Sequence, residues 1–230
     1  KKEKPRALDA IICKIQFLES EIDEMVNAYE NMYLPYDERL KIYKQDDSFL
    51  EKAIWDFEGT PENKYPLLLH YHPLTIYRYQ VIKQADTLLG HFLLEDLADE
   101  VSIKNAFDYY EKVTTHDSSL SSCIYGIMAS RCGYYEKAYE YFLETVRLDL
   151  DNTHGNTKDG LHVGNLGGTA LSVIFGFAGY RIKNQGIELA PWCPKTWDGY
   201  GFRLLYRNRR LLVKVTSEVE IELLEGEKLQ

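Results

Sequence analysis

The chain has 230 residues, of which 45% are hydrophobic and 27% are charged, so it is long enough to bury a substantial core. Its net charge of −9 argues against a nucleic-acid partner. No apolar run reaches the length of a membrane span, and no signal-peptide pattern opens the chain. The four cysteines lack metal-ligand spacing, which favours free thiols in a reducing cytoplasm and predicts no bound metal.

Residues 1–178 are predicted to be mainly helical. The first residue is a lysine, and the opening charged run leads directly into an apolar segment, so we expect a piece of a longer chain. Ile22, Met25 and Tyr29 then follow at helical spacing, and Pro35 is expected to end their helix. Residues 40–74 contain Gly and Pro breakers and are predicted to form loops.

Four further helices are expected in the middle of the chain. A long one should follow Pro73 and carry both Lys83 and Phe92, and two more should cover about 118–131 and 134–148. The glycines between Gly164 and Gly168 are expected to form a turn that opens a last apolar helix.

Residues 179–230 are predicted to form a small β domain, because the apolar period changes to two near Tyr180. Short strands are expected at residues 181–183, 187–189, 202–206, 211–215 and 219–223. Asn208 stands where a hairpin turn needs a left-handed residue. Helices followed by strands predict separate layers rather than an α/β alternation.

The segment from Thr114 to Ser121 places one histidine among several hydroxyls at a predicted helix start. The first N–H groups of a helix have no partner within the helix, and the helix dipole favours negative charge there. Together with His116 and the serines, they predict an anion site, with phosphate as the obvious ligand. The alternative is a plain capping segment.

Lys83 and Gln84 form a second polar feature. An ammonium group and an amide supply the donors and the acceptor that sugar hydroxyls need. Taken alone, the pair is more simply interpreted as a solvated helix face.

Several segments, in chain order, resemble the phosphorylases of glycoside hydrolase family 65. They are residues 31–37, 45–50, 65–68, 83–86 (Lys-Gln-Ala-Asp), 115–121 (Thr-His-Asp-Ser-Ser-Leu-Ser), 147–150, 159–162 and 167–169 (Gly-Gly-Thr). Members of this family include maltose, trehalose, kojibiose and nigerose phosphorylases. Residues 72–78 are more similar to the kojibiose, nigerose and trehalose enzymes than to the maltose ones.

The resemblance implies a fold and a set of site residues. The fold is mainly α, the C-terminal half of an (α/α)6 barrel followed by a small, sandwich-like C-terminal β-sheet domain. Lys83 and Gln84 would bind the glucosyl residue. The residues that would bind phosphate are His116, Ser118, Ser119, Gly168 and Thr169.

The implied activity is inverting phosphorolysis, in which an α-glucosyl disaccharide and inorganic phosphate give β-glucose 1-phosphate and a free sugar. Phosphate would be a co-substrate, and no cofactor is expected. The general acid, a glutamate in the family, finds no matching motif here, so we expect it in an upstream remainder of the enzyme. A homodimer is possible for such an enzyme.

Two alternatives stay open at this point. One is a trehalase-like hydrolase, which an anion-holding loop disfavours. The other is a non-catalytic carbohydrate-binding or scaffold module, since the expected acid is not found. Phosphate dependence of sugar release separates phosphorylase from hydrolase.

Overall fold

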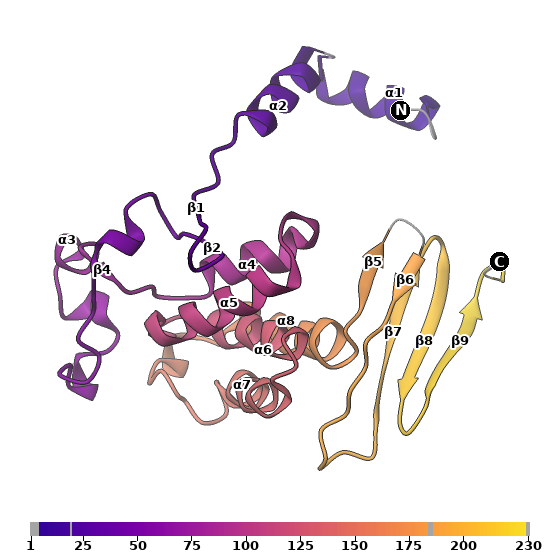
Figure 1. Cartoon of the computed structure of the whole chain (residues 1–230). Coiled ribbons are helices and arrows are strands. Elements are labelled where there is room, and N and C mark those ends of the chain that lie inside the picture. The colour runs from indigo at the N-terminus through magenta and orange to yellow at the C-terminus, as the bar shows by residue number, and fades with distance from the viewer. Residues whose placement is uncertain (1–4, 19, 184–185, 229–230) are drawn as a thin grey trace. The chain divides into compact units, whose positions relative to one another are not determined.

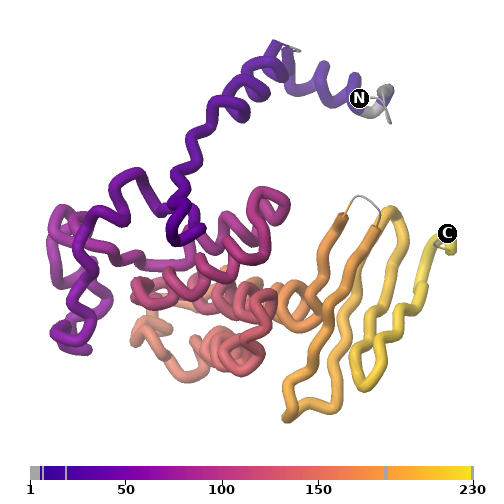
Figure 2. The backbone as a smooth tube through the Cα atoms, viewed as in Figure 1, coloured from indigo at the N-terminus to yellow at the C-terminus, as the bar shows by residue number. Residues whose placement is uncertain are grey.

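The structure, a computed structural model, describes residues 5–18, 20–183 and 186–228. It contains two compact units, residues 1–35 and residues 36–230. Figures 1 and 2 follow the chain through both units, from indigo at the N-terminus to yellow at the C-terminus.

The first unit consists of two helices, α1 (Pro5–Ile15) and α2 (Ser20–Glu30). The Leu18 N–H donates to the Glu21 carboxylate over 2.7 Å, which satisfies a donor at the start of α2. The helix ends at Glu30, earlier than the predicted stop at Pro35. Just after this end, the Asn31 side chain donates to the Asn27 carbonyl. The apolar side chains of α2 are exposed, so the predicted amphipathic pattern buries nothing within this unit's described residues.

The second unit is organised around α6 (Ser121–Arg131), which α4, α5, α7 and α8 contact. The other helices are α3 (Pro73–Ile76), α4 (Asp86–Leu93), α5 (Glu100–Tyr110), α7 (Tyr135–Arg147) and α8 (Val163–Leu171). Nearly every residue of α6 is buried, as expected for a helix that is apolar all round. Among the described residues, no helix is long and apolar enough to cross a membrane.

Close approach of α6 and α7 depends on a glycine. A Cβ on Gly126 would lie 3.3 Å from the Cβ of Tyr141, tighter than ordinary van der Waals contact. The pair α6–α7 therefore packs with its backbones near one another, and Ala138 on the facing helix is fully buried.

The single long helix predicted after Pro73 is wrong. The chain instead forms the short helix α3, then strand β4 (Tyr79–Gln80), then a bridge residue and a bend, and only then α4. The reason is non-local pairing: β4 lies parallel to β3 (Ala53–Ile54), and Ile82 bridges to Thr114. Lys83 and Gln84 consequently lie at a bend before α4 rather than on a helix face.

The predicted glycine turn at residues 164–168 is also wrong, because these residues lie inside α8. A Cβ on Gly168 would come within 2.8 Å of both Cβ and Sγ of Cys123, so the glycine lets α8 press against α6. The helix continues into a π-helical segment, Ser172–Phe177, which also contacts α6.

The loop-like prediction for residues 40–74 is broadly confirmed. The segment contains β2 (Ile42–Tyr43), β3 and single helical turns, and β1 (Tyr36–Asp37), just before it, pairs antiparallel with β2. Trp55, Leu67 and Ile76 form a small buried cluster of their own.

The C-terminal strands form two antiparallel sheets. Strands β5 (Arg181–Lys183) and β6 (Gly186–Glu188) make a hairpin, and β7 (Tyr200–Tyr206), β8 (Arg209–Val215) and β9 (Val219–Glu225) form a meander in that order. Asn208 has φ 61° in the β7–β8 turn, which confirms the left-handed residue predicted there. Helix gives way to strand between Phe177 and Arg181, where the sequence changes its period; that this point is a domain boundary stays a prediction.

Candidate functional site

One parallel bridge brings the two predicted binding segments together. The Ile82 N–H donates to the Val113 carbonyl over 2.8 Å, and the Thr115 N–H donates to the Ile82 carbonyl over 2.9 Å. Because paired parallel strands run in the same direction, Lys83–Gln84 and Thr115–His116 leave the bridge on the same side. Residues far apart in the sequence are thus placed side by side.

His116 lies in an enclosed aromatic setting. Its ring centroid is 4.6 Å from that of Tyr125 and 5.4 Å from that of Tyr141, and its backbone is left-handed with φ 55°. Its Nδ1 lies 2.9 Å from the hydroxyl of the buried Ser121. Burial lowers the pKa of the imidazole to about 4, so the ring is neutral near pH 7. The imidazole therefore offers a hydrogen bond rather than a positive charge.

The rest of the His116 loop is fixed by its own polar groups. The Ser118 hydroxyl accepts from the Leu120 N–H over 3.3 Å, and the Ser118 carbonyl accepts from the Ser121 N–H over 3.0 Å. Asp117 accepts from the N–H of the buried Leu67 over 2.9 Å, which ties the loop to the small Trp55 cluster. Leu120 is the N-cap residue of α6 and no side chain caps the helix, so the hydroxyls do not act as a plain cap; the anion site stays a prediction.

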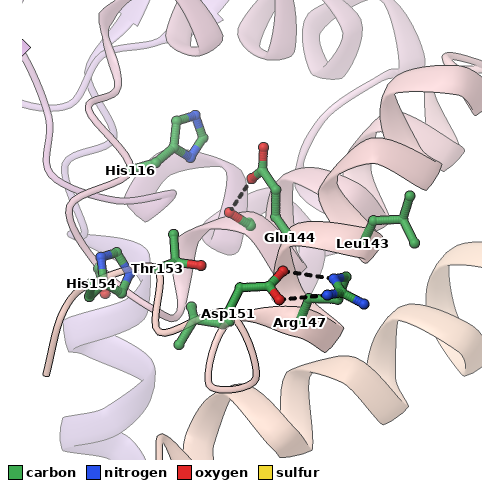
Figure 3. Close-up of a pocket in the computed structure, with 10 residues that line it drawn as sticks. His116, Leu143, Glu144, Arg147, Asp151, Thr153 and His154 are labelled. Atoms are coloured by element: carbon green, nitrogen blue, oxygen red, sulfur yellow. Dashed lines mark hydrogen bonds and ion pairs between the residues drawn. The ribbon is translucent and has the colours of Figure 1, made fainter. Parts of the chain in front are cut away.

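A pocket of about 460 Å³ opens beside this loop, between the start of α6, the end of α7 and the following loop (Figure 3). It is lined by His116, Ser118, Ser122, Leu143, Glu144, Arg147, Leu148, Asp151, Thr153 and His154. Two of the five predicted phosphate residues, His116 and Ser118, thus share one pocket. Ser119, Gly168 and Thr169 are not in its lining.

The pocket contains charged residues that the sequence reasoning did not select. Arg147 and Asp151 form a two-pronged ion pair with contacts of 2.7 and 2.5 Å, and Ser122 donates to Glu144 over 3.0 Å. The hydrogen bond from Arg147 lowers the pKa of Asp151. The sequence signal for this pocket is that Arg147 belongs to residues 147–150, one of the segments that carry the family resemblance.

Gly168 and Thr169 have visible roles inside the helical core. Gly168 provides the contact with Cys123, and the Thr169 hydroxyl donates to the Asn165 carbonyl over 3.1 Å, within α8. Their assignment to phosphate stays a prediction.

Gln84 is oriented by a small hydrogen-bond network, while Lys83 is not. The Gln84 side-chain amide donates to Asp86 over 3.0 Å, and Asp86 also accepts from Gln45 over 3.3 Å. Thr87 completes the network by donating to Gln45 over 2.8 Å. Lys83 is exposed, and within the described part of the chain its ammonium makes no hydrogen bond or ion pair.

His162 forms a close pair with Asp149 at the start of α8. Its Nδ1 lies 2.6 Å from one carboxylate oxygen, and its backbone N–H donates to the other over 2.9 Å. These hydrogen bonds lower the pKa of Asp149. The pair fixes the end of the loop between α7 and α8 at the start of α8. The ring centroid of His162 lies 6.0 Å from that of His154.

Two carboxylates in the segments that carry the family resemblance, Asp46 and Asp117, are already engaged. Burial raises the pKa of Asp46, but hydrogen bonds from Lys52 and Ser48 outweigh it, so the pKa lies below its usual value. Asp117 is held by the Leu67 N–H. An acid that protonates a leaving oxygen must hold its proton near neutral pH, and Asp46 is poorly suited to that task.

The fold is a set of helices packed around α6, followed in the chain by antiparallel strands, and comparisons with known proteins give its family. Residues 3–171 match the central catalytic domain of glycosyl hydrolase family 65, and residues 180–230 match the C-terminal domain of the same family. The chain belongs to glycosyl hydrolase family 65.

Several of its relatives in this family are named as disaccharide phosphorylases. The chain is 57% identical to an α,α-trehalose phosphorylase of Geobacillus stearothermophilus, with 99% of this chain and 30% of the relative covered. It is 37% identical to a maltose phosphorylase of Bacillus subtilis, with 92% of this chain and 28% of the relative covered. A solved structure from human microbiome with the provisional name kojibiose phosphorylase has a TM-score of 0.81 at 32% identity, with 94% of this chain and 29% of that one covered.

The chain spans about 30% of the length of the curated relatives it matches.

Proposed function

We propose that this chain forms part of an inverting disaccharide phosphorylase. The observation that carries the proposal is the Ile82–Thr114 bridge, which sets the predicted sugar-binding pair beside the predicted phosphate loop in a chain of this family. The proposed donor is an α-glucosyl disaccharide, with α,α-trehalose first because of the 57% identity to a trehalose phosphorylase.

In the proposed reaction, Lys83 and Gln84 hold the glucosyl ring while His116 and Ser118 hold inorganic phosphate below the anomeric carbon. A phosphate oxygen forms a bond to that carbon as the glycosidic bond breaks on the opposite face. The departing oxygen takes a proton from a general acid supplied by another part of the enzyme. The products are β-glucose 1-phosphate and a free sugar.

A phosphate nucleophile needs no carboxylate as base, and the two carboxylates of the pocket are engaged, Glu144 by Ser122 and Asp151 by Arg147. An inverting hydrolase uses a second carboxylate to activate water, whereas phosphate is already an anionic nucleophile. Hydrogen-bond donors that position it are then sufficient on that face. No cofactor is proposed beyond phosphate as co-substrate.

The assembly and setting of the enzyme are also proposals. We expect the site to be completed by segments that correspond to the upstream parts of the relatives, and the complete enzyme to be a cytoplasmic homodimer. Neither a nucleic acid nor a membrane is a proposed partner.

The test uses a full-length chimera in which residues 1–230 replace the matching segment of the Geobacillus stearothermophilus trehalose phosphorylase. Release of glucose 1-phosphate from trehalose, maltose, kojibiose and nigerose is measured with and without phosphate. Phosphate-dependent release supports the proposal. Phosphate-independent release of glucose would favour the hydrolase, and sugar binding without turnover would favour a binding module.

A further inference from the structure

The buried hydroxyl of Ser121 has one visible task, which concerns His116. Ser121 is the first residue of α6 and is fully buried. Its Oγ lies 2.9 Å from Nδ1 of His116 and makes no other hydrogen bond among the described residues. The His116 ring itself lines the pocket beside the loop.

The direction of this hydrogen bond follows from the donors available. A serine hydroxyl carries one proton, and a buried proton without an acceptor costs about 1–3 kcal/mol. If Nδ1 donated to Ser121, the hydroxyl proton would have no acceptor within the described part of the chain. If Ser121 donates to Nδ1, that proton is satisfied, so the second arrangement is the stable one.

The state of the ring then follows. Burial against Tyr125 and Tyr141 disfavours the doubly protonated ring, and the ordinary pKa of the imidazole is correspondingly lowered. The charge of Glu111 acts in the other direction and raises the pKa of the ring, but Lys137 neutralises that carboxylate at 2.6 Å, and it also accepts from the Tyr141 hydroxyl. The Glu144 carboxylate, which lines the same pocket, accepts from Ser122. A neutral ring that accepts at Nδ1 must carry its proton on Nε2.

We propose that Ser121 is a positioning residue that fixes His116 as the Nε2–H tautomer, so that the ring presents an N–H donor to an oxyanion in the pocket. The inference rests on the proposed function, in which that oxyanion is inorganic phosphate. It adds a residue that does not line the pocket and acts only through His116.

A neutral donor with a fixed proton suits a nucleophilic phosphate. A protonated imidazole could transfer its proton to phosphate and so weaken the nucleophile, whereas a neutral N–H only orients it. Ser121 therefore sets both the availability of the donor and the angle of the ring.

The experiment uses the full-length chimera with isotopically labelled histidine, and nitrogen NMR reports which ring nitrogen of His116 carries the proton. His116→Asn identifies the signal. Ser121→Ala is compared with Ser130→Ala, which removes another buried hydroxyl from the same helix, one that accepts from Trp192. KM for phosphate and KM for trehalose are measured for each variant.

We expect the wild type to be protonated on Nε2 and Ser121→Ala to lose this uniform state. KM for phosphate should rise roughly 3- to 10-fold, as for the loss of one ordinary hydrogen bond, and KM for trehalose should change less than about twofold. Ser121→Thr, which keeps the hydroxyl, should restore the tautomer, and Ser130→Ala should alter neither measurement.

Two results would overturn the inference. One is a wild-type ring protonated on Nδ1, which is decisive even where Ser121→Ala fails to fold. The other is a Ser121→Ala variant whose KM values for phosphate and trehalose are the same as those of Ser130→Ala, since this would indicate a merely structural role. The proposed function fails separately if His116→Ala leaves KM for phosphate unchanged while the wild-type ring is protonated on Nε2.

Discussion

The His116 loop and the Lys83–Gln84 segment lie side by side but are held very differently. His116 is enclosed by two tyrosine rings and hydrogen-bonded to a buried serine, and the residues that flank it are tied down by backbone contacts. Lys83 is exposed, and only Gln84 of the second segment is oriented by a neighbour, Asp86.

The difference teaches which half of the proposed reaction this chain prepares by itself. Fixed donors lose little entropy when they bind a ligand, so the rigid His116 loop suits the small anion proposed for it. The Lys83 side chain must be ordered by the sugar or by groups from elsewhere in the enzyme. The chain thus builds one face of the site firmly and the other face loosely.

The largest expected effect concerns the 230 residues tested alone. They should give no glucose 1-phosphate, because the general acid is expected in an upstream remainder of the enzyme, and general acid catalysis contributes about 10²–10⁴-fold. Glucose 1-phosphate formation is assayed with the purified chain, then with the rest of the relative added as a separate polypeptide. Robust turnover by the chain alone would direct attention to Asp46, Asp47 and Asp117.

His116→Ala in the chimera tests the firmly held face. It should weaken the use of phosphate about 10- to 150-fold, as expected for a lost hydrogen bond to a charged group, and affect sugar binding far less. Initial rates are measured against phosphate concentration at saturating trehalose. An unaltered phosphate dependence would contradict the assignment of this loop.

Lys83→Ala and Gln84→Ala test the loosely held face. Each should impair every glucosyl donor by about 10-fold or more, whatever the acceptor sugar, because the proposed contacts are to the common ring. The kcat/KM values for trehalose, maltose, kojibiose and nigerose are compared. Loss confined to one disaccharide would move the pair to the acceptor side.

Acid should destabilise the chain partly through His116. Burial holds its pKa at about 4, below the ordinary 6.5, so the unfolded chain takes up a proton that the folded chain refuses. Stability is therefore unaffected by this group above pH 6.5 and falls as the pH drops from 6.5 towards 4, by about 2 kcal/mol at pH 5. Urea midpoints at pH 7.5 and pH 5 are compared for wild type and His116→Asn. An equal pH dependence in both would show that the ring is not enclosed as described.

Asp86→Ala should produce the smallest effect. Loss of the carboxylate frees the Gln84 amide, and we expect KM for the disaccharide to rise about 2- to 10-fold with KM for phosphate unchanged. Asp86→Asn keeps an oxygen acceptor and should recover most of the loss. A rise in KM for phosphate that exceeds the rise in KM for the disaccharide would mean that the two faces are coupled.

The sequence by itself determined the features that depend on neighbouring residues. Apolar spacing located the helices near 121–131 and 135–147, the change of period located the strands, and Asn208 marked the hairpin turn. The hydroxyl-rich start of α6 drew attention to His116, and the order of the motifs gave the family.

Tertiary structure decided whatever depends on residues far away in the chain. Tyr79–Gln80 pairs with Ala53–Ile54, and Ile82 pairs with Thr114. Because these residues bond to distant backbone, they do not continue the predicted long helix. Contact with Cys123 turns Gly168 from a suspected turn residue into a helix-packing residue. The neutral state of His116, its link to Ser121 and the pocket residues Arg147 and His154 follow from burial and packing, which local patterns do not encode.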